Sequence, residues 1–217
     1  MYRNPIRALI LSLIAGSLAT AADFSFSGSL AADNDIQLFR FSLASTNSIT
    51  LRTYSYAGGT NQLGAAVPRG GFDPVLALFN STGTLINEDD DGYGNVPADS
   101  VTGQHWDSYI QTTLAAGTYI VSLTQYENFP NGPTLSDGFS RTGQPKFTSA
   151  FGCSNGGFCD RTADNRTANW QMEILDTVSA TAVPEPNAPA LLAIGTVFVG
   201  AFCSRKFWRN FLDHKSR

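Results

Sequence analysis

Residues 36–43 read IQLFRFSL, and the stretch alternates apolar with polar side chains. Successive side chains of a β-strand point to opposite faces, so the alternation predicts a strand with one face in a core and one in water. Residues 24–30 (FSFSGSL) and 49–54 (ITLRTY) mostly repeat the pattern. The chain therefore opens with three predicted strands that each have one wet face.

Further strands are predicted at 75–79, 84–86, 109–114, 118–123, 147–151 and 170–175. The first four of these form two hairpins around glycine-containing turns. No segment before the C-terminal tail keeps a helical period. We therefore expect an all-β domain at residues 22–178, an antiparallel β-sandwich or jelly roll of about eight or nine strands.

The first 21 residues have the pattern of a signal peptide. Arg3 and Arg7 precede an apolar stretch, and Ala19-Thr20-Ala21 is the small-x-small pattern that signal peptidase recognises. We expect export through the secretory translocon and cleavage after Ala21.

The C-terminal end predicts a membrane span. Residues 179–187 are expected to be a linker that contains Pro184-Glu185-Pro186, and residues 188–204 a transmembrane helix. The charge-free run at 188–203 would be about 24 Å long as a helix, somewhat shorter than a bilayer core of about 30 Å. The tail at 205–217 carries Arg205 and Lys206, so the positive-inside rule places the C-terminus in the cytoplasm.

Together, Pro184-Glu185-Pro186, the apolar run and the basic end resemble the PEP-CTERM sorting signal of Gram-negative bacteria. Phe207 and Trp208 interrupt the basic cluster, which departs from the usual pattern. The resemblance implies that an exosortase processes the tail near the motif. It also implies a secreted or cell-surface protein, transiently anchored in the inner membrane and associated with exopolysaccharide, biofilm or extracellular matrix.

The part between the two ends is acidic. Residues 22–183 hold 7 basic and 16 acidic residues, a net charge of about −9. Nucleic acids bind clusters of Lys and Arg, so the charge argues against a nucleic-acid partner.

Residues 72–79 (FDPVLALF), 83–85 (GTL) and 114–119 (LAAGTY), with the acidic loop between them, look like the bacterial pre-peptidase C-terminal domain. That family is a β-sandwich appended to secreted enzymes. The resemblance covers roughly residues 23–175 and implies an accessory or adhesive module rather than a catalyst.

The acidic loop is the one segment with metal-site chemistry. Asn87, Asp89 and Asp91, followed by Gly92, match the first positions of an EF-hand calcium loop. Ala98 stands where that loop requires a bidentate glutamate, so a true EF-hand is not expected. Two interpretations stay open: a calcium site on a sandwich loop, to which Asp73 could contribute, and a solvated turn between strands.

Cys153 and Cys159 bracket a turn-forming segment in a chain predicted to enter an oxidising compartment, so we expect a disulfide. The small loop would contribute roughly 2–3 kcal/mol. Asp33-Asn34-Asp35 is interpreted as a simple turn.

Enzyme chemistry finds little support, and we expect no catalytic residues. The exported part contains one histidine, His105, interpreted as a loop residue, and it lacks hydrolase and nucleotide-binding motifs. A glycosidase would need two facing carboxylates, for which the candidates are Asp73, Asp89, Asp91, Asp107 and Asp137. The stronger alternative is a carbohydrate-binding module, with or without calcium. An exposed coplanar row of rings that stacks on sugars would favour it, whereas scattered buried rings would favour a structural role, and we expect most of the candidate rings to lie in the core. The candidates are Tyr54, Tyr56, Tyr93, Trp106, Tyr109, Tyr126 and Phe129.

Overall fold

The computed structural model describes residues 20–154 and 157–184 of the 217-residue chain. Within them no helix is long and apolar enough to cross a membrane. The signal peptide as far as Ala19, the Glu185-Pro186 part of the sorting motif, the transmembrane helix at 188–204 and the tail with Arg205 and Lys206 lie outside the described residues. They stay predictions.

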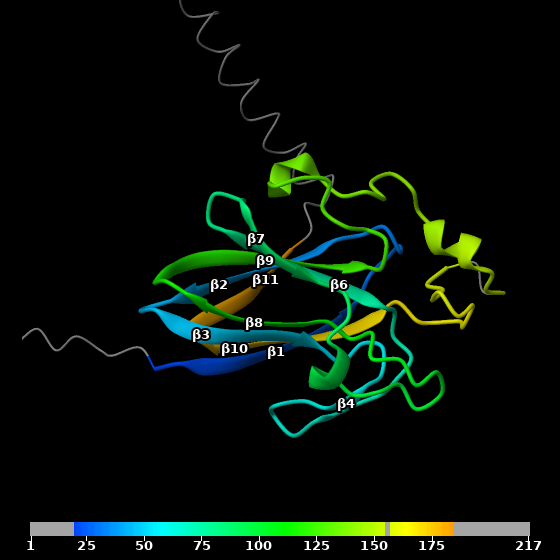
Figure 1. The fold of residues 1–217 in the computed structure, drawn as a ribbon, viewed down its shortest axis with the longest axis horizontal. Helices are drawn as coiled ribbons and strands as arrows, with labels where there is room; N and C mark the ends of the chain where they lie inside the picture. Colours follow the sequence, from blue (N-terminus) through cyan, green and yellow to red (C-terminus); the bar gives the residue numbers. More distant parts are fainter. Residues whose placement is uncertain (1–19, 155–156, 185–217) are drawn as a thin grey trace, which may run out of the picture.

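Two facing antiparallel sheets form the body of the described part of the chain (Figure 1). One sheet has four strands in the order β1-β10-β3-β8, and the other has five in the order β11-β2-β9-β6-β7. The strands are β1 (Ala22–Ser29), β2 (Gln37–Leu43), β3 (Asn47–Thr53), β6 (Pro74–Asn80), β7 (Leu85–Asp89), β8 (Tyr109–Leu114), β9 (Gly117–Gln125), β10 (Asn169–Thr177) and β11 (Ser179–Val183). This arrangement confirms the predicted antiparallel β-sandwich.

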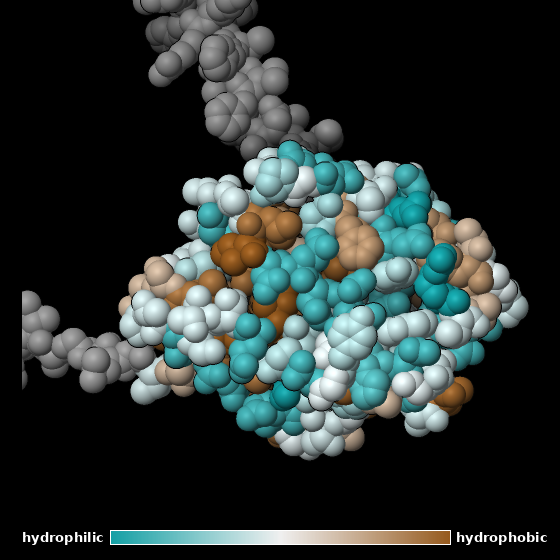
Figure 2. All heavy atoms as spheres, in the orientation of Figure 1, coloured by the Kyte–Doolittle hydropathy of each residue, from teal (hydrophilic) through white to brown (hydrophobic). Residues whose placement is uncertain are grey.

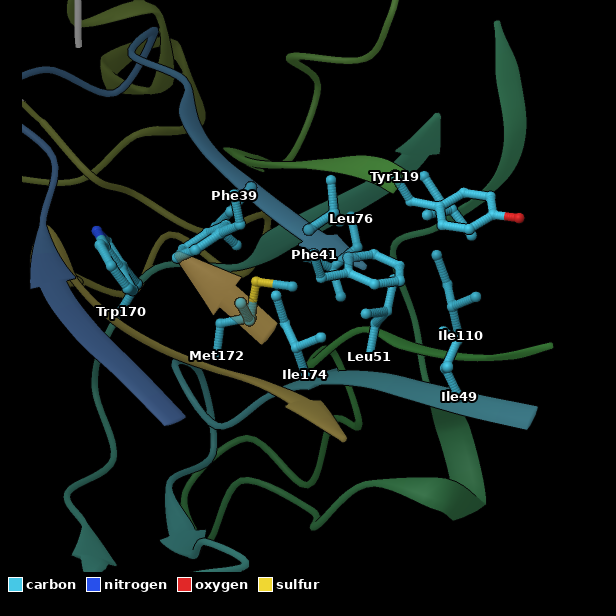
Figure 3. Close-up of a cluster of buried hydrophobic side chains, with 14 of the residues drawn as sticks. Phe39, Phe41, Ile49, Leu51, Leu76, Ile110, Tyr119, Trp170, Met172 and Ile174 are labelled. Carbon is cyan, nitrogen blue, oxygen red and sulfur yellow. The ribbon is translucent and has the colours of Figure 1, made fainter. Parts of the chain in front are cut away.

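The core lies between the sheets, where the alternating apolar side chains of both meet (Figure 3). On β2, Phe39 and Phe41 are buried and Arg40 between them is exposed, as the alternation predicts. Phe39 packs edge-on against Trp170 of the opposite sheet, with ring centroids 5.5 Å apart. Burial of such a side chain contributes about 1.5–3 kcal/mol.

Strand β6 reads PVLALFN and is buried on both faces. Leu76 and Leu78 belong to the core between the sheets, whereas Ala77 and Phe79 form a second cluster with Phe139. The segment that contains Phe139 therefore covers the outer face of the five-stranded sheet. This double burial explains why β6 is a continuous apolar run rather than an alternating one.

A small hairpin, β4 (Gly59–Thr60) with β5 (Ala66–Val67), lies outside the four-stranded sheet and was not predicted. Glu173 of β10 is fully buried beneath it and accepts hydrogen bonds from Gln62 N (2.6 Å) and Arg52 Nε (2.7 Å). The outer face of β10 is therefore covered at this position as well.

The prediction of a strand at 147–151 was wrong, because Phe147–Phe151 is a 3-10 helix. Its start is held by Asp33, a residue interpreted from the sequence as part of a simple turn. Asp33 is 2% exposed, and its Oδ2 accepts hydrogen bonds from Thr148 N (2.9 Å) and Thr148 Oγ1 (2.6 Å). A contact across more than one hundred residues leaves no local sequence signal.

Strand β11 occupies residues 179–183, where the sequence suggested the start of a linker. It pairs with β2 from Ser179↔Ser42 to Val183↔Leu38 and forms one edge of the five-stranded sheet. Its sequence, SATAV, has small side chains and a weak alternation. The folded part consequently extends to Val183, the residue before Pro184.

Hydrophilic and intermediate residues cover most of the face seen in Figure 2, with apolar residues in small groups. The large apolar side chains that are most exposed in the described residues come from four separate segments: Leu63, Ile86, Tyr93 and Val101.

Candidate functional site

The acidic segment begins on β7, the edge strand beside β6. Asn87 lies opposite Leu78 and Asp89 opposite Leu76. Cross-strand partners share a face, so these polar groups project at the rim of the core. Asp89 Oδ2 accepts a hydrogen bond from Tyr109 N (2.7 Å) at the start of β8 and so links the two sheets. Asn87 Oδ1 accepts from Glu88 N (2.8 Å).

Asp91 lies just after β7 and Asp73 just before β6, and both have raised pKa values. Burial, together with the carboxylates of Asp90 and Asp89, raises the pKa of Asp91 to about 6. Asp73 is 3% exposed, and burial followed by the charges of Asp91 and Asp90 raises its pKa well above the usual range. Within the described residues, Asp73 Oδ1 has no hydrogen-bond partner.

These observations bear on the calcium hypothesis in two ways. Asn87 and Asp89 already accept backbone hydrogen bonds, and no three Asp, Glu, His or Cys side chains of residues 20–154 and 157–184 are grouped to hold a metal ion. Asp73, however, is a buried carboxylate whose pKa is raised by burial and then by the charges of Asp91 and Asp90, and a cation nearby would offset this repulsion. Calcium binding at Asn87, Asp89 and Asp91, with Asp73 as a further ligand in that hypothesis, thus stays a prediction.

Gly92 follows Asp91 for a packing reason. Its backbone φ is −73°, an ordinary value, and its N–H donates to Asp107 O (2.7 Å). A Cβ atom at this position would lie 2.6 Å from Val96 Cγ1 and 2.8 Å from Asp107 O. The close approach of these loops requires glycine, whereas an EF-hand needs glycine for a sharp turn.

A buried ionic network, not foreseen from the sequence, joins three loops. The Arg166 side chain is 1% exposed, and its guanidinium contacts Asp160 Oδ2 (2.8 Å) and Asp99 Oδ2 (3.3 Å). Arg69 adds two hydrogen bonds to Asp99, at 2.8 and 3.1 Å. The guanidinium of Arg166 also lies 3.7 Å from the ring centroid of Tyr56, whose hydroxyl donates to Asp160.

The network lowers the pKa values of its two acids. Burial by itself would raise the pKa of Asp99, but hydrogen bonds from Arg69 and from the Thr102 and Val101 N–H groups outweigh burial and hold it well below its usual range. Burial is likewise outweighed at Asp160, whose pKa is lowered by hydrogen bonds from Thr162, Asp164 N and Arg166. Both carboxylates are therefore stabilised in the ionised form.

Cys153 and Cys159 are at bonding distance, with sulfur atoms 1.96 Å and Cα atoms 5.6 Å apart. This geometry suits a disulfide, as the sequence predicted. Cys159 is fully buried, and its N–H donates to Thr148 Oγ1 (3.2 Å). The pair thereby fastens the 3-10 helix that Asp33 also holds.

Three of the five acids considered for catalysis, Asp89, Asp107 and Asp137, accept structural hydrogen bonds. Asp107 is fully buried and accepts hydrogen bonds from Thr53 Oγ1 (2.8 Å) and Ala57 N (2.9 Å). Asp137 caps a 3-10 helix by accepting from Thr134 N (2.9 Å). His105 Nδ1 lies 2.8 Å from Val96 O, in keeping with a loop role.

The rings considered for sugar stacking do not share one exposed surface. Tyr54 and Tyr56 are 6% and 0% exposed, whereas Tyr93 is 69% exposed. Tyr126 and Phe129 pack edge-on against each other, with centroids 5.7 Å apart.

The chain was also compared with known proteins. No family model and no curated protein matches the sequence. Among solved structures, the pre-peptidase C-terminal domain of a collagenase from Bacillus anthracis is similar, with 10% sequence identity and a TM-score of 0.33. The match covers 73% of this chain and 89% of that domain.

Proposed function

We propose that this is an exported, exosortase-sorted protein of the cell surface or extracellular matrix. Its β-sandwich serves as a non-catalytic structural or adhesive module. The proposal combines the predicted export signal, the sorting motif and the fold. In this proposal the partners during export are the translocon, signal peptidase and an exosortase. The mature protein is then associated with exopolysaccharide.

The positions of the two fold boundaries carry the proposal. Strand β1 begins at Ala22, immediately after the predicted signal-peptidase site at Ala21, and β11 ends at Val183, immediately before Pro184. Processing at both sites would leave every described strand intact. A cut inside β1 or β11 would instead remove ladder hydrogen bonds from a sheet edge.

The cysteine pair adds independent support. Disulfides persist in oxidising compartments and are rare in the cytosol. A pair at bonding distance, with one cysteine fully buried, suits a domain that folds after export.

The non-catalytic part of the proposal is supported by the contacts of three of the five candidate acids. Asp89, Asp107 and Asp137 each accept hydrogen bonds that hold backbone segments in place. A glycosidase needs one carboxyl group as an acid and another as a base or nucleophile beside a scissile bond. Acids that organise turns are poorly suited to those roles.

The intact mass of the protein purified from its native host tests the sorting proposal. We expect a chain that begins at Ala22 and ends near Pro184, and a longer chain when the exosortase gene is deleted. Replacing Pro184, Glu185 and Pro186 by alanine should also retain the tail. The matched control Pro189→Ala keeps the motif and should be processed normally. A tail retained in the wild-type strain would make this a membrane-anchored protein and refute exosortase sorting.

A further inference from the structure

A pocket of about 650 Å³ lies beside the four-stranded sheet, under hairpin β4–β5. Residues of β1 and β10 line one side, and the hairpin with the segment that follows it lines the other. Figure 1 shows the hairpin next to this sheet, on the side away from β2 and β9. The volume is within the range of about 300–1,000 Å³ typical of small-molecule sites.

The strands present a row of neutral polar side chains to the pocket. Ser25 and Ser27 line it from β1, and Asn169 and Gln171 from β10. Residues two apart on a strand share a face, and Ser27 is the cross-strand partner of Gln171. The alternation that sends Phe26 and Trp170 toward the core thus gathers hydroxyl and amide groups on the opposite face.

Gln171 is the most deeply placed of these groups. It is 5% exposed, and its Nε2 donates to Ser25 Oγ (2.6 Å). Among the described residues its Oε1 is buried without a hydrogen-bond partner. A buried acceptor without a donor is unfavourable, and a ligand hydroxyl group that reached it would supply the missing hydrogen bond.

The pocket offers no unpaired charge among the described residues that line it. Arg69 is the charged residue of the lining, and Asp99 binds its guanidinium through two hydrogen bonds. A charged ligand would have to compete with that pair, whereas a neutral ligand would not.

We propose that this pocket binds a neutral, polyhydroxylated ring, namely a sugar unit of an oligosaccharide. Serine, asparagine and glutamine side chains each donate and accept hydrogen bonds, as sugar hydroxyl groups do. Ala66 and Pro68 of the opposite wall supply apolar contacts for the C–H faces of the ring. The site differs from an exposed aromatic row and does not depend on sorting by an exosortase.

Calorimetric titration of the full chain tests this inference. The probes are cellobiose, maltose, lactose and N,N′-diacetylchitobiose, in a detergent without a sugar headgroup. We expect saturable binding of at least one disaccharide. Ala66→Trp, which fills the pocket from its exposed wall, should weaken that binding by at least about tenfold. The matched control Ala116→Trp, on the distant β8–β9 turn, should stay within about twofold of wild type.

Asn169→Ala provides a second test that does not add bulk. It removes an exposed amide from the pocket rim and should weaken binding by about fivefold or more, the effect of losing about 1 kcal/mol of hydrogen bonding. If Ala66→Trp fails to fold, the binding measured for Asn169→Ala tests the sugar-binding inference instead. The inference is overturned if none of the four disaccharides binds at millimolar concentration, if both pocket variants bind as wild type does, or if tetra-alanine rather than a sugar binds in an Ala66-dependent way.

Discussion

Asp73 and Asp91 are two acids whose protonated forms the fold favours. Their pKa values are raised, in each case first by burial and then by neighbouring carboxylates. A raised pKa means that the folded protein binds protons more tightly than the unfolded chain. The resulting loss of unfolding free energy is absent below about pH 4, where the acids are protonated in both the folded and the unfolded state. It grows as the pH rises above the pKa that the acids have in the unfolded chain.

Asp73→Asn should consequently stabilise the protein at neutral pH. The amide keeps the shape of the side chain without its charge. We expect the melting temperature at pH 7 to rise by roughly 2–4 °C, the shift that about 1 kcal/mol produces in a domain of this size. At about pH 3.5 the variant and wild type should melt together, because both side chains are then neutral. Calorimetry at the two pH values would measure this, and a drop at pH 7 would show that the Asp73 charge has a partner.

Calcium should act on the same acids. A divalent cation beside Asp91 would offset the repulsion among neighbouring carboxylates. We expect calcium to raise the melting temperature of wild type, by an amount equivalent to about 1.4 kcal/mol at ten times Kd. Asp91→Asn should abolish that rise.

Asp176→Asn is a matched control for the calcium experiment. It removes an exposed acid near the end of β10, at an irregular position of the strand where the φ of 63° suits asparagine. It should leave the calcium response unchanged. No response of wild type at millimolar calcium would make the acidic segment a solvated turn.

Arg166 is the residue whose loss should cost most. Arg166→Ala would leave the buried carboxylates of Asp99 and Asp160 short of their counter-ion, at a cost of about 3–5 kcal/mol of unfolding free energy. Urea denaturation would measure it. Arg161→Ala is the matched control, because Arg161 is 54% exposed and pairs with Glu127 at 3.2 Å. An exposed pair contributes about 0–1 kcal/mol, so equal losses in the two variants would contradict the network's importance.

At the scale of single elements, hairpin β4–β5 depends on one close backbone approach. Gly71 follows the hairpin, and a Cβ atom there would lie 2.3 Å from Asn169 O and 2.5 Å from Ser55 O. Both neighbours are backbone atoms, so the methyl group of Gly71→Ala can be accommodated only if the strands move. We expect a loss of about 1–3 kcal/mol by urea denaturation.

Gly94→Ala is the control for this substitution. Nothing lies within 4 Å of a Cβ atom at Gly94, and its φ is not in the left-handed range. Its stability should therefore match or slightly exceed that of wild type. A similar loss in both variants would mean that glycine flexibility, rather than the close approach at Gly71, sets the cost.

The elements also show which parts of the fold a sequence can predict. Strand β2 was predicted because Phe39 and Phe41 alternate with polar residues over a single core face. The segment at 147–151 was mistaken for a strand because its helix start depends on Asp33, far away in the chain. A local sequence pattern can predict a strand with one buried face. It cannot predict a hydrogen bond from a side chain of a distant loop.

The same distinction applies to the candidate site. The cysteine pair was predicted because its members are six residues apart and flank a turn. The ionic network was not, because Arg166 and Asp99 are 67 residues apart and become neighbours only through folding. The calcium-loop pattern in the sequence could not show that backbone N–H groups donate hydrogen bonds to the side-chain oxygens of Asn87 and Asp89.

For the whole molecule, the two groups of acids predict the shape of the stability–pH profile. Asp99 and Asp160 have lowered pKa values, so their contribution is present above about pH 4 and is lost as the pH falls further. The raised pKa of Asp91, about 6, makes its destabilising contribution develop between about pH 4 and 6, and that of Asp73 also grows as the pH rises above about 4. Stability should therefore be greatest near pH 4–5.

Urea denaturation from pH 2 to 8 would measure this profile. In Arg166→Ala the loss on the acidic side should shrink, because the pKa values of Asp99 and Asp160 would return toward ordinary values. In Asp73→Asn the decline on the neutral side should shrink instead. A profile that rises steadily to pH 8 would contradict the penalty assigned to Asp73 and Asp91.

The position of β11 also determines how the sandwich responds to force. A pull on the chain beyond Val183 loads first the Val183↔Leu38 end of the β11–β2 ladder, where Gln37 Nε2 donates to Val183 O (3.1 Å). The bonds would then be loaded one after another toward the Ser42–Ser179 side-chain contact of 2.6 Å at the far end. Complete peeling of β11 would uncover the edge of β2, a surface ready to pair with another strand. Tension at Val183 would thus expose a strand edge of the sandwich that can pair with a strand of a neighbouring molecule.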